Sequence, residues 1–247
     1  MDPSFQHLEY LYRELDDLKN DFRNPNLYRL VLSYAKGKEI LDVGCGVGHF
    51  LAVAHQEGFC VAGLEPNEKL IELSRKFYPF DLNIYPLYAE QIDQIRQKFD
   101  SITLIDVLEH IEDDVRLLVQ LKNLLKEDGR LIILVPNHPH LCGHRDKMLG
   151  HFRRYSADEL KRKLRANGFD VEHMRVWNMI GYFPYFIAEK ILRKPLETSL
   201  RKNKGISGNP LKKLLNRVLG VWFRQVENNI NFGFGLSLLC VAKKKDL

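Results

Sequence analysis

The sequence predicts an α/β protein built on a doubly wound, mostly parallel sheet. From about residue 38 to residue 177, apolar runs of strand length alternate with segments of helical periodicity, which is the pattern of successive βα units. Several runs are rich in Val, Ile and Leu on both faces, as a parallel strand covered by helices on both sides requires. The predicted strands are Glu39–Val43, Phe59–Leu64, Asn83–Tyr88, Ser101–Asp106, Arg130–Val135, Asp170–Trp177 and Leu236–Ala242.

Helix-capping residues set the register of these βα units. Asn67 can cap a helix that follows the second strand, and Ser156 opens a capping-box sequence with Glu159 at its third helical position. A helix is also expected to begin near His49. The other predicted helices are Asn67–Phe77, Ile111–Lys126, which ends before Asp128-Gly129, and the segment from Ser156 to Asn167-Gly168.

Two segments outside the alternating core are predicted to be helical. Helices are expected over Phe5–Asn20 and Asn26–Ala35, with Pro25 between them, and over Pro184–Lys194 and Leu211–Val226, with a basic loop over 202–210 between those. The second segment is far longer than the ~4–6 residues of an ordinary connection, so it must carry structure of its own. The predicted organisation is a helical cap over 1–37, a core over 38–177, a helical insertion over 178–234 and a final core strand within 235–247.

Composition indicates a cytoplasmic protein. The four cysteines are widely spaced with no C-x-x-C pair, and the N-terminal segment carries acids where a signal peptide would need a basic start. The longest apolar runs reach only about half of the ~18 residues of a membrane-spanning helix. A chain of 247 residues can bury a substantial core without disulfide bonds.

The net charge of +5 is unevenly distributed, because Lys and Arg are concentrated in the later part of the chain. This asymmetry indicates an acidic partner on one side, with a merely solvated basic face as the alternative. The predicted helix over 211–226 alternates apolar and basic residues, so it suits peripheral contact with an anionic membrane. Packing on its own domain or on a second copy is the favoured alternative.

A glycine-rich turn, D-V-G-C-G-V-G over residues 42–48, follows the first predicted strand. Alternate glycines let the backbone turn tightly and approach a ligand without a Cβ in the way. Dinucleotide-binding folds use a similar loop, so the glycines alone are a weak signal. Two acids make the signal more specific: Asp42, before the first glycine, and Glu65, at the end of the next strand. A carboxylate at the second position can accept hydrogen bonds from both hydroxyls of a ribose, which predicts a nucleoside cofactor.

With D-x-G-C-G-x-G at its first turn, the sequence resembles the class I S-adenosylmethionine-dependent methyltransferase family over about residues 38–177 and the last strand. The resemblance implies a Rossmann-like sheet of seven strands, the last antiparallel, with S-adenosylmethionine as the cofactor. The cofactor residues that it implies are Asp42, Gly44, Cys45, Gly46 and Gly48 around the methionine moiety, Glu65 at the ribose, Pro66 and Asn67 beside the adenine, and Asp106 next to the reacting methyl group.

The sequence departs from this family after the third strand. Members commonly carry an Asp-Ala pair there that contacts the adenine edge, whereas this chain has Leu87-Tyr88-Ala89-Glu90. Ala89 and Glu90 are therefore assigned to the adenine edge, with Glu90 supplying the carboxylate.

His110, just beyond the fourth strand, is a candidate general base for a hydroxyl acceptor. Loops at the carboxyl ends of strands line the ligand sites of open α/β sheets, which supports this location. Alternatively, Glu109 and His110 begin the next helix and pack or cap there. A metal bound by Glu109, His110 and Glu112, as in some quinone-pathway methyltransferases with a similar segment, is a further alternative. We predict no metal, because adjacent residues rarely converge on one ion.

The loop after the fifth strand gives the strongest indication of the methyl acceptor. It contains D-x-x-x-G-H-x-R-R-Y-S, from residue 146 to residue 156, and such a density of charged and aromatic groups suits an anionic or hydroxyl-rich acceptor. The pattern resembles that of bacterial methyltransferases of surface polysaccharide or lipid-linked sugar pathways. That resemblance assigns His151 a catalytic role and Asp146, Arg154 and Tyr155 to the acceptor. Alternatively, Arg153 and Arg154 brace the loop against the next helix.

The sequence therefore predicts O-methylation of a small or glycan- or lipid-linked hydroxyl acceptor. Quinone-pathway methylation, RNA methylation, a non-catalytic S-adenosylmethionine-binding protein and an NAD dehydrogenase are the alternatives. A nucleic-acid partner is not expected, because Asp106-Val107-Leu108-Glu109 stands where an N-P-P-Y-like tetrapeptide would mark methylation of a base amino group, and no added RNA-binding module is recognisable.

Overall fold

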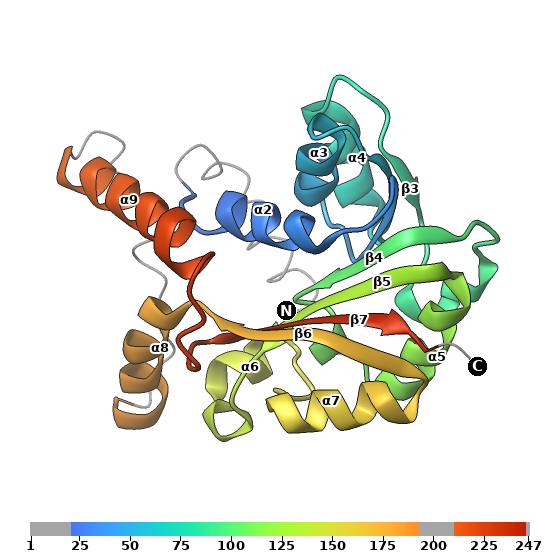
Figure 1. Cartoon of the computed structure of the whole chain (residues 1–247). Helices are drawn as coiled ribbons and strands as arrows, with labels where there is room; N and C mark the ends of the chain where they lie inside the picture. The colour runs from blue at the N-terminus through green and yellow to red at the C-terminus, as the bar shows by residue number, and fades with distance from the viewer. Residues whose placement is uncertain (1–20, 193–209, 246–247) are drawn as a thin grey trace.

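The computed structural model describes residues 21–192 and 210–245 and contains one seven-stranded sheet (Figure 1). The strand order is β3-β2-β1-β4-β5-β7-β6, and β7 runs antiparallel to both β5 and β6 while the remaining pairs are parallel. The doubly wound sheet and the antiparallel last strand predicted from the sequence are confirmed. The strands are β1 (Glu39–Val43), β2 (Cys60–Leu64), β3 (Asn83–Tyr85), β4 (Phe99–Ile105), β5 (Leu125–Pro136), β6 (Phe169–Trp177) and β7 (Ser237–Lys244).

Helices cover both faces of the sheet because the central strands are apolar on both sides. On one face, Leu117 and Leu118 of α5 and Leu160 of α7 pack into the larger core. On the other face, Leu27 of α2 and Phe50 of α3 pack against β1, β5 and β7. The helices are α2 (Asn24–Tyr34), α3 (His49–Gln56), α4 (Glu68–Phe77), α5 (Asp114–Leu124), α6 (His144–Met148), α7 (Ala157–Ala166), α8 (Met179–Phe186) and α9 (Pro210–Trp222).

The predicted caps are present, but several predicted helix boundaries are wrong. For example, α8 begins at Met179, five residues before the predicted start at Pro184, and Pro184 lies inside it. Asn67 accepts the Lys69 amide at the start of α4, and Ser156 accepts the Glu159 amide at the start of α7. The helix α2 begins at Asn24 rather than at the predicted Asn26, so Pro25 lies in its first turn, where its missing N–H costs no intrahelical hydrogen bond. The predicted helix Phe5–Asn20 and the predicted basic loop, apart from its last residue, lie outside the described residues.

The helical insertion is anchored to the core by one buried acid. Glu227 accepts the backbone amides of Asn178, at 3.0 Å, and Met179, at 2.8 Å, so it ties the residues after α9 to the start of α8. Arg175 of β6 donates to the carbonyls of Glu227 and Asn228. These contacts hold α8 and α9 beyond one end of β6 and β7 (Figure 1). Within the described ranges, no helix has both the length and the apolar character needed to cross a membrane.

Candidate cofactor and acceptor site

The glycine turn borders open space at the carboxyl end of β1. Gly46 has a φ of 57°, and a Cβ built there would meet no atom within 4 Å. Gly48 caps α3 with a φ of 79°, and a Cβ there would lie 2.6 Å from Leu82 Cδ1. Gly46 is thus the position where bare backbone faces the space that a ligand could occupy, while Gly48 is required for packing.

Glu65 is fixed beside this turn by two backbone amides. Its Oε2 accepts from Gly46 N at 3.0 Å and its Oε1 from Asn67 N at 2.9 Å, and its side chain is buried. Burial raises its pKa, and the two amide hydrogen bonds partly offset that rise. Each carboxylate oxygen retains a lone pair, so Glu65 can still accept hydrogen bonds from a ribose diol.

Asp42 lies buried at the end of β1, where its carboxylate accepts the Thr103 hydroxyl at 2.6 Å. Burial raises its pKa to about 7, the Thr103 hydrogen bond lowers it, and repulsion from Glu65 adds to the rise. A nearby cation would favour the ionised form of both acids. The residues therefore fit S-adenosylmethionine in two respects: open space beside Gly46, and an acid pair suited to its positive charges.

Three other predicted cofactor residues lie in the turn or near it. Cys45 is buried and its side chain packs behind the turn against Gly63. Asp106 follows β4 with a φ of 55°, and its carboxylate lies 3.5 Å from the Arg23 guanidinium. Pro66 stands between Glu65 and the Asn67 cap of α4.

The two residues assigned to the adenine edge begin a short 3-10 helix after β3. Ala89 is buried in the main core, whereas Glu90 is exposed and its carbonyl accepts the Gln120 side chain. The contacts of all these cofactor residues with a bound nucleoside stay predictions.

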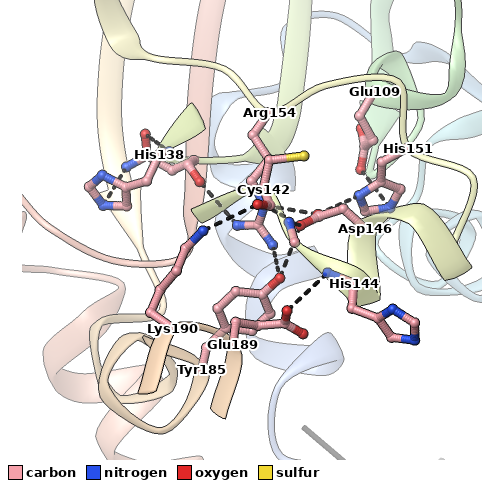
Figure 2. A network of polar contacts seen from close by, with 12 residues as sticks. Glu109, His138, Cys142, His144, Asp146, His151, Arg154, Tyr185, Glu189 and Lys190 are labelled. Atoms are coloured by element: carbon pink, nitrogen blue, oxygen red, sulfur yellow. Dashed lines mark hydrogen bonds and ion pairs between the residues drawn. The ribbon is translucent and has the colours of Figure 1, made fainter. Parts of the chain in front are cut away.

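On the acceptor side, Asp146 is the centre of a buried polar network (Figure 2). Arg154 Nε donates to both Asp146 oxygens, at 2.8 and 2.9 Å, and its other nitrogens donate to Asn137 O and the Tyr185 hydroxyl. His151 Nδ1 lies 2.9 Å from Asp146 Oδ1. Burial alone would raise the pKa of Asp146, but the hydrogen bonds from His151 and Arg154 outweigh it and hold that pKa well below its ordinary value.

His151 and His110 meet Glu109 at the end of this network. The two imidazole rings are 4.6 Å apart in an edge-to-face arrangement, and His151 Nε2 lies 4.0 Å from Glu109 Oε1. Glu109 and His110 do not begin the next helix: they form a separate 3-10 turn, Leu108–His110, while Asp113 caps α5. The predicted catalytic histidines are therefore adjacent, although one lies in the 3-10 turn after β4 and the other in the loop after β5.

Tyr155 and Arg153 point elsewhere. Tyr155 is fully buried, and its hydroxyl donates to Asp114 Oδ2 at 2.7 Å and so is turned toward the core. Arg153 lies 3.2 Å from the same carboxylate and donates to Glu112 O. Both residues thus attach the loop to the start of α5, and Lys163 of the following helix, α7, binds the same Asp114 carboxylate.

Sequence reasoning missed Tyr185, which α8 brings into the Asp146 network. Its hydroxyl lies 2.6 Å from Arg154 Nη2 and 3.1 Å from Asp146 Oδ2. No sequence pattern marks this residue, because it lies among the aromatic residues of a helix in the insertion. The network depends on that insertion, which the sequence had separated from the core.

The strand order, with a glycine turn beside a buried acid, defines a Rossmann-like protein of the methyltransferase type. The chain belongs to the methyltransferase domain family, whose model matches residues 8–174. A solved S-adenosylmethionine-dependent methyltransferase from Archaeoglobus fulgidus has the same fold, with 21% identity, a TM-score of 0.58 and coverage of 98% of this chain and 99% of that one. The family and the fold together support S-adenosylmethionine as the cofactor.

Curated relatives match less than half of this chain. A ubiquinone biosynthesis O-methyltransferase from Coxiella burnetii is 31% identical over 105 residues, which is 41% of this chain and 45% of the relative. A tRNA U34 carboxymethyltransferase from Glaesserella parasuis is 36% identical over 108 residues, 41% of this chain and 33% of the relative. The matched segment thus spans less than half the length of either relative.

Proposed function

We propose that this methyltransferase methylates a hydroxyl oxygen of a small or glycan- or lipid-linked acceptor. The observation that carries the proposal is the His151–Asp146 pair, with Nδ1 and Oδ1 2.9 Å apart, beside His110. The histidines follow β4 and β5, while the glycine turn follows β1. These parallel strands end at one edge of the sheet, which is where open α/β sheets bind ligands.

We propose that the cofactor lies against the bare backbone at Gly46. When bound, S-adenosylmethionine supplies an activated methyl group on a positively charged sulfur. Glu65, already fixed by two amides, accepts the ribose hydroxyls, and the nearby Asp42 favours a cationic ligand. Hydrogen-bond donors and acceptors that are already in place align the reactants, and alignment alone can lower the activation free energy by up to ~7–11 kcal/mol.

We propose that His151 and His110 promote loss of the acceptor's hydroxyl proton. Asp146 is ionised and only accepts hydrogen bonds, so it fixes the proton of His151 on Nδ1. In the neutral ring, Nε2 then carries a lone pair, and it is directed toward Glu109. Arg154 and Tyr185 act as positioning residues, because they hold Asp146 in place.

The direct test is transfer of label from methyl-labelled S-adenosylmethionine to separate pools of nucleotide sugars, lipid-linked glycans, hydroxyl-bearing quinone precursors and RNA. We expect label in a hydroxyl-bearing small or lipid-linked pool. His151→Ala should lower the rate by about 100-fold or more, the usual scale for a group that assists proton transfer. His144→Ala, which removes an exposed imidazole at the start of α6, should not lower the rate. Label in RNA alone would overturn the assignment of the acceptor.

A surface on α9 favours the lipid-linked class. Leu214, Val218 and Val221 are exposed on one stripe of the helix, with Lys213 and Arg217 beside them. An apolar stripe with basic flanks suits the surface of an anionic membrane.

Vesicle sedimentation tests this membrane contact. The chain should bind phosphatidylglycerol vesicles more strongly than phosphatidylcholine vesicles, and Val218→Asp should weaken that binding. Val115→Asp, at an exposed apolar site on α5, is the control that should leave it unchanged. Equal weakening by the two variants would contradict a role for α9.

A further inference from the structure

Glu109 is a buried acid without a hydrogen bond to its carboxylate. It is 1% exposed, and neither carboxylate oxygen has a hydrogen-bond partner among the described residues. Arg154, the cation that pairs with the neighbouring Asp146, directs its guanidinium to Asp146, Asn137 O and Tyr185 instead. The nearest imidazole nitrogen, His151 Nε2, lies 4.0 Å from Oε1, beyond hydrogen-bond distance. Buried carboxylates in proteins are normally hydrogen-bonded or bound to metal, so among the described residues this one lacks such a partner.

Two imidazole nitrogens converge on the same point. Glu109, His110 and His151 each offer one ligand atom, and these three atoms lie within 4.8 Å of one another. Ligands that share one ion at bond lengths of about 2.0–2.2 Å stand roughly 3–4 Å apart, so a small closure of the side chains would complete the set. Adjacency of Glu109 and His110 does not prevent this, because the third ligand comes from a different loop.

The surroundings hold His151 in the orientation of a metal ligand. Asp146 accepts from Nδ1, which leaves Nε2 for the shared point, and this carboxylate–imidazole pair is the usual support of a metal-bound histidine. The Phe152 amide donates to Glu109 O at 2.8 Å, so the backbone ties the two ligand-bearing segments together.

We propose that Glu109, His110 and His151 form a binding site for one divalent first-row transition ion such as Zn²⁺. Two imidazoles and a carboxylate are ligands that such ions favour, whereas Mg²⁺ and Ca²⁺ prefer oxygen alone. Three protein ligands leave coordination positions open. Resting on the proposed function, we assign an open position to the acceptor oxygen. With Nε2 of His151 bound to the ion, the two histidines would promote loss of the hydroxyl proton by holding the ion, which would lower the pKa of the bound hydroxyl so that its proton passes to solvent.

Metal binding can be measured without any turnover. The full chain, stripped with chelator, is titrated with Co²⁺ and followed by visible absorption, and bound Zn²⁺ is counted after equilibrium dialysis. We expect one ion per chain in the wild type and in His144→Ala. In Glu109→Gln, which keeps the shape of the side chain, and in His151→Ala, affinity should fall at least tenfold, with circular dichroism used to confirm folding.

Failure of the metal site and failure of the proposed methyltransferase function give different results. No binding by the wild type, or unchanged affinity in either ligand variant, would overturn the metal site. S-adenosylmethionine binding, measured calorimetrically on the same samples, tests the cofactor site alone. If the protein binds the ion but not S-adenosylmethionine, the proposed function is contradicted and the metal site is still supported.

Discussion

Glu65 Oε2 accepts a hydrogen bond from the Gly46 amide at 3.0 Å, so the acid that follows β2 sets the conformation of the turn that follows β1. The turn is further held because the amides of Gly44 and Cys45 both donate to Leu64 O. In the proposed complex, one side chain therefore shapes the cofactor loop and accepts the ribose hydroxyls.

Glu65→Gln tests this dual role. Glutamine keeps the shape but replaces one acceptor oxygen by an NH₂ group, which then faces a backbone N–H donor. We expect the Kd for S-adenosylmethionine, measured by calorimetry, to rise by about tenfold or more, equivalent to at least ~1.4 kcal/mol. Glu72→Gln, at an exposed site on α4, should leave it unchanged. Equal affinity in both variants would remove Glu65 from the site.

Gly46→Ala and Gly58→Ala form a matched pair. Both glycines have positive φ, 57° and 85°, and at both a Cβ would meet nothing within 4 Å. Each variant should lose about 1–2 kcal/mol of unfolding free energy, because a left-handed backbone disfavours a Cβ. Only Gly46→Ala should also weaken S-adenosylmethionine binding, since its methyl group would enter the space assigned to the ligand. Equal binding by the two variants would place the nucleoside elsewhere.

Asp42 makes stability depend on pH. Burial raises its pKa from 3.8 to about 7, so between those values the folded state binds more protons than the unfolded state. Its contribution to stability therefore falls as pH rises from about 4 to about 7. Asp42→Asn keeps an oxygen that can accept the Thr103 hydroxyl and removes the charge. The variant should unfold at higher urea than the wild type at pH 8, with the gap closing toward pH 4.

The same Asp42→Asn variant should bind S-adenosylmethionine more weakly at pH 8, because a negative charge near the cationic ligand is lost. A variant that is both less stable and unchanged in binding would contradict the proposed role of this acid.

Site residues that depend on contacts between nearby parts of the sequence could be predicted, whereas those that depend on long-range packing could not. Asp42, Glu65 and the glycine turn could be predicted because each element is local: a strand end, a tight turn and the next strand end. Tyr185 and the buried state of Glu109 could not, because they depend on how α8 and the loop after β5 pack against the sheet. Pro25 was misplaced for a related reason, since a proline in the first turn of a helix resembles a helix break in the sequence.

Arg154 should be the stability anchor of the acceptor loop. Its side chain is 5% exposed and it neutralises the buried Asp146, whereas Arg153 is 29% exposed and shares Asp114 with Lys163. Arg154→Met leaves a buried carboxylate without its cation and should cost about 3–5 kcal/mol in urea unfolding. Arg153→Met should cost about 1 kcal/mol or less. If the two variants lose similar amounts of unfolding free energy, the Arg154–Asp146 ion pair is not the stability anchor of the loop.

A crystal structure with S-adenosylhomocysteine would show whether a methyl-donor nucleoside binds between the glycine turn and Glu65. We expect ligand density against the Gly46 backbone, with both ribose hydroxyls within hydrogen-bond distance of the Glu65 carboxylate. Density at another place on the chain, or side chains filling the space beside Gly46 in the presence of saturating ligand, would contradict this expectation.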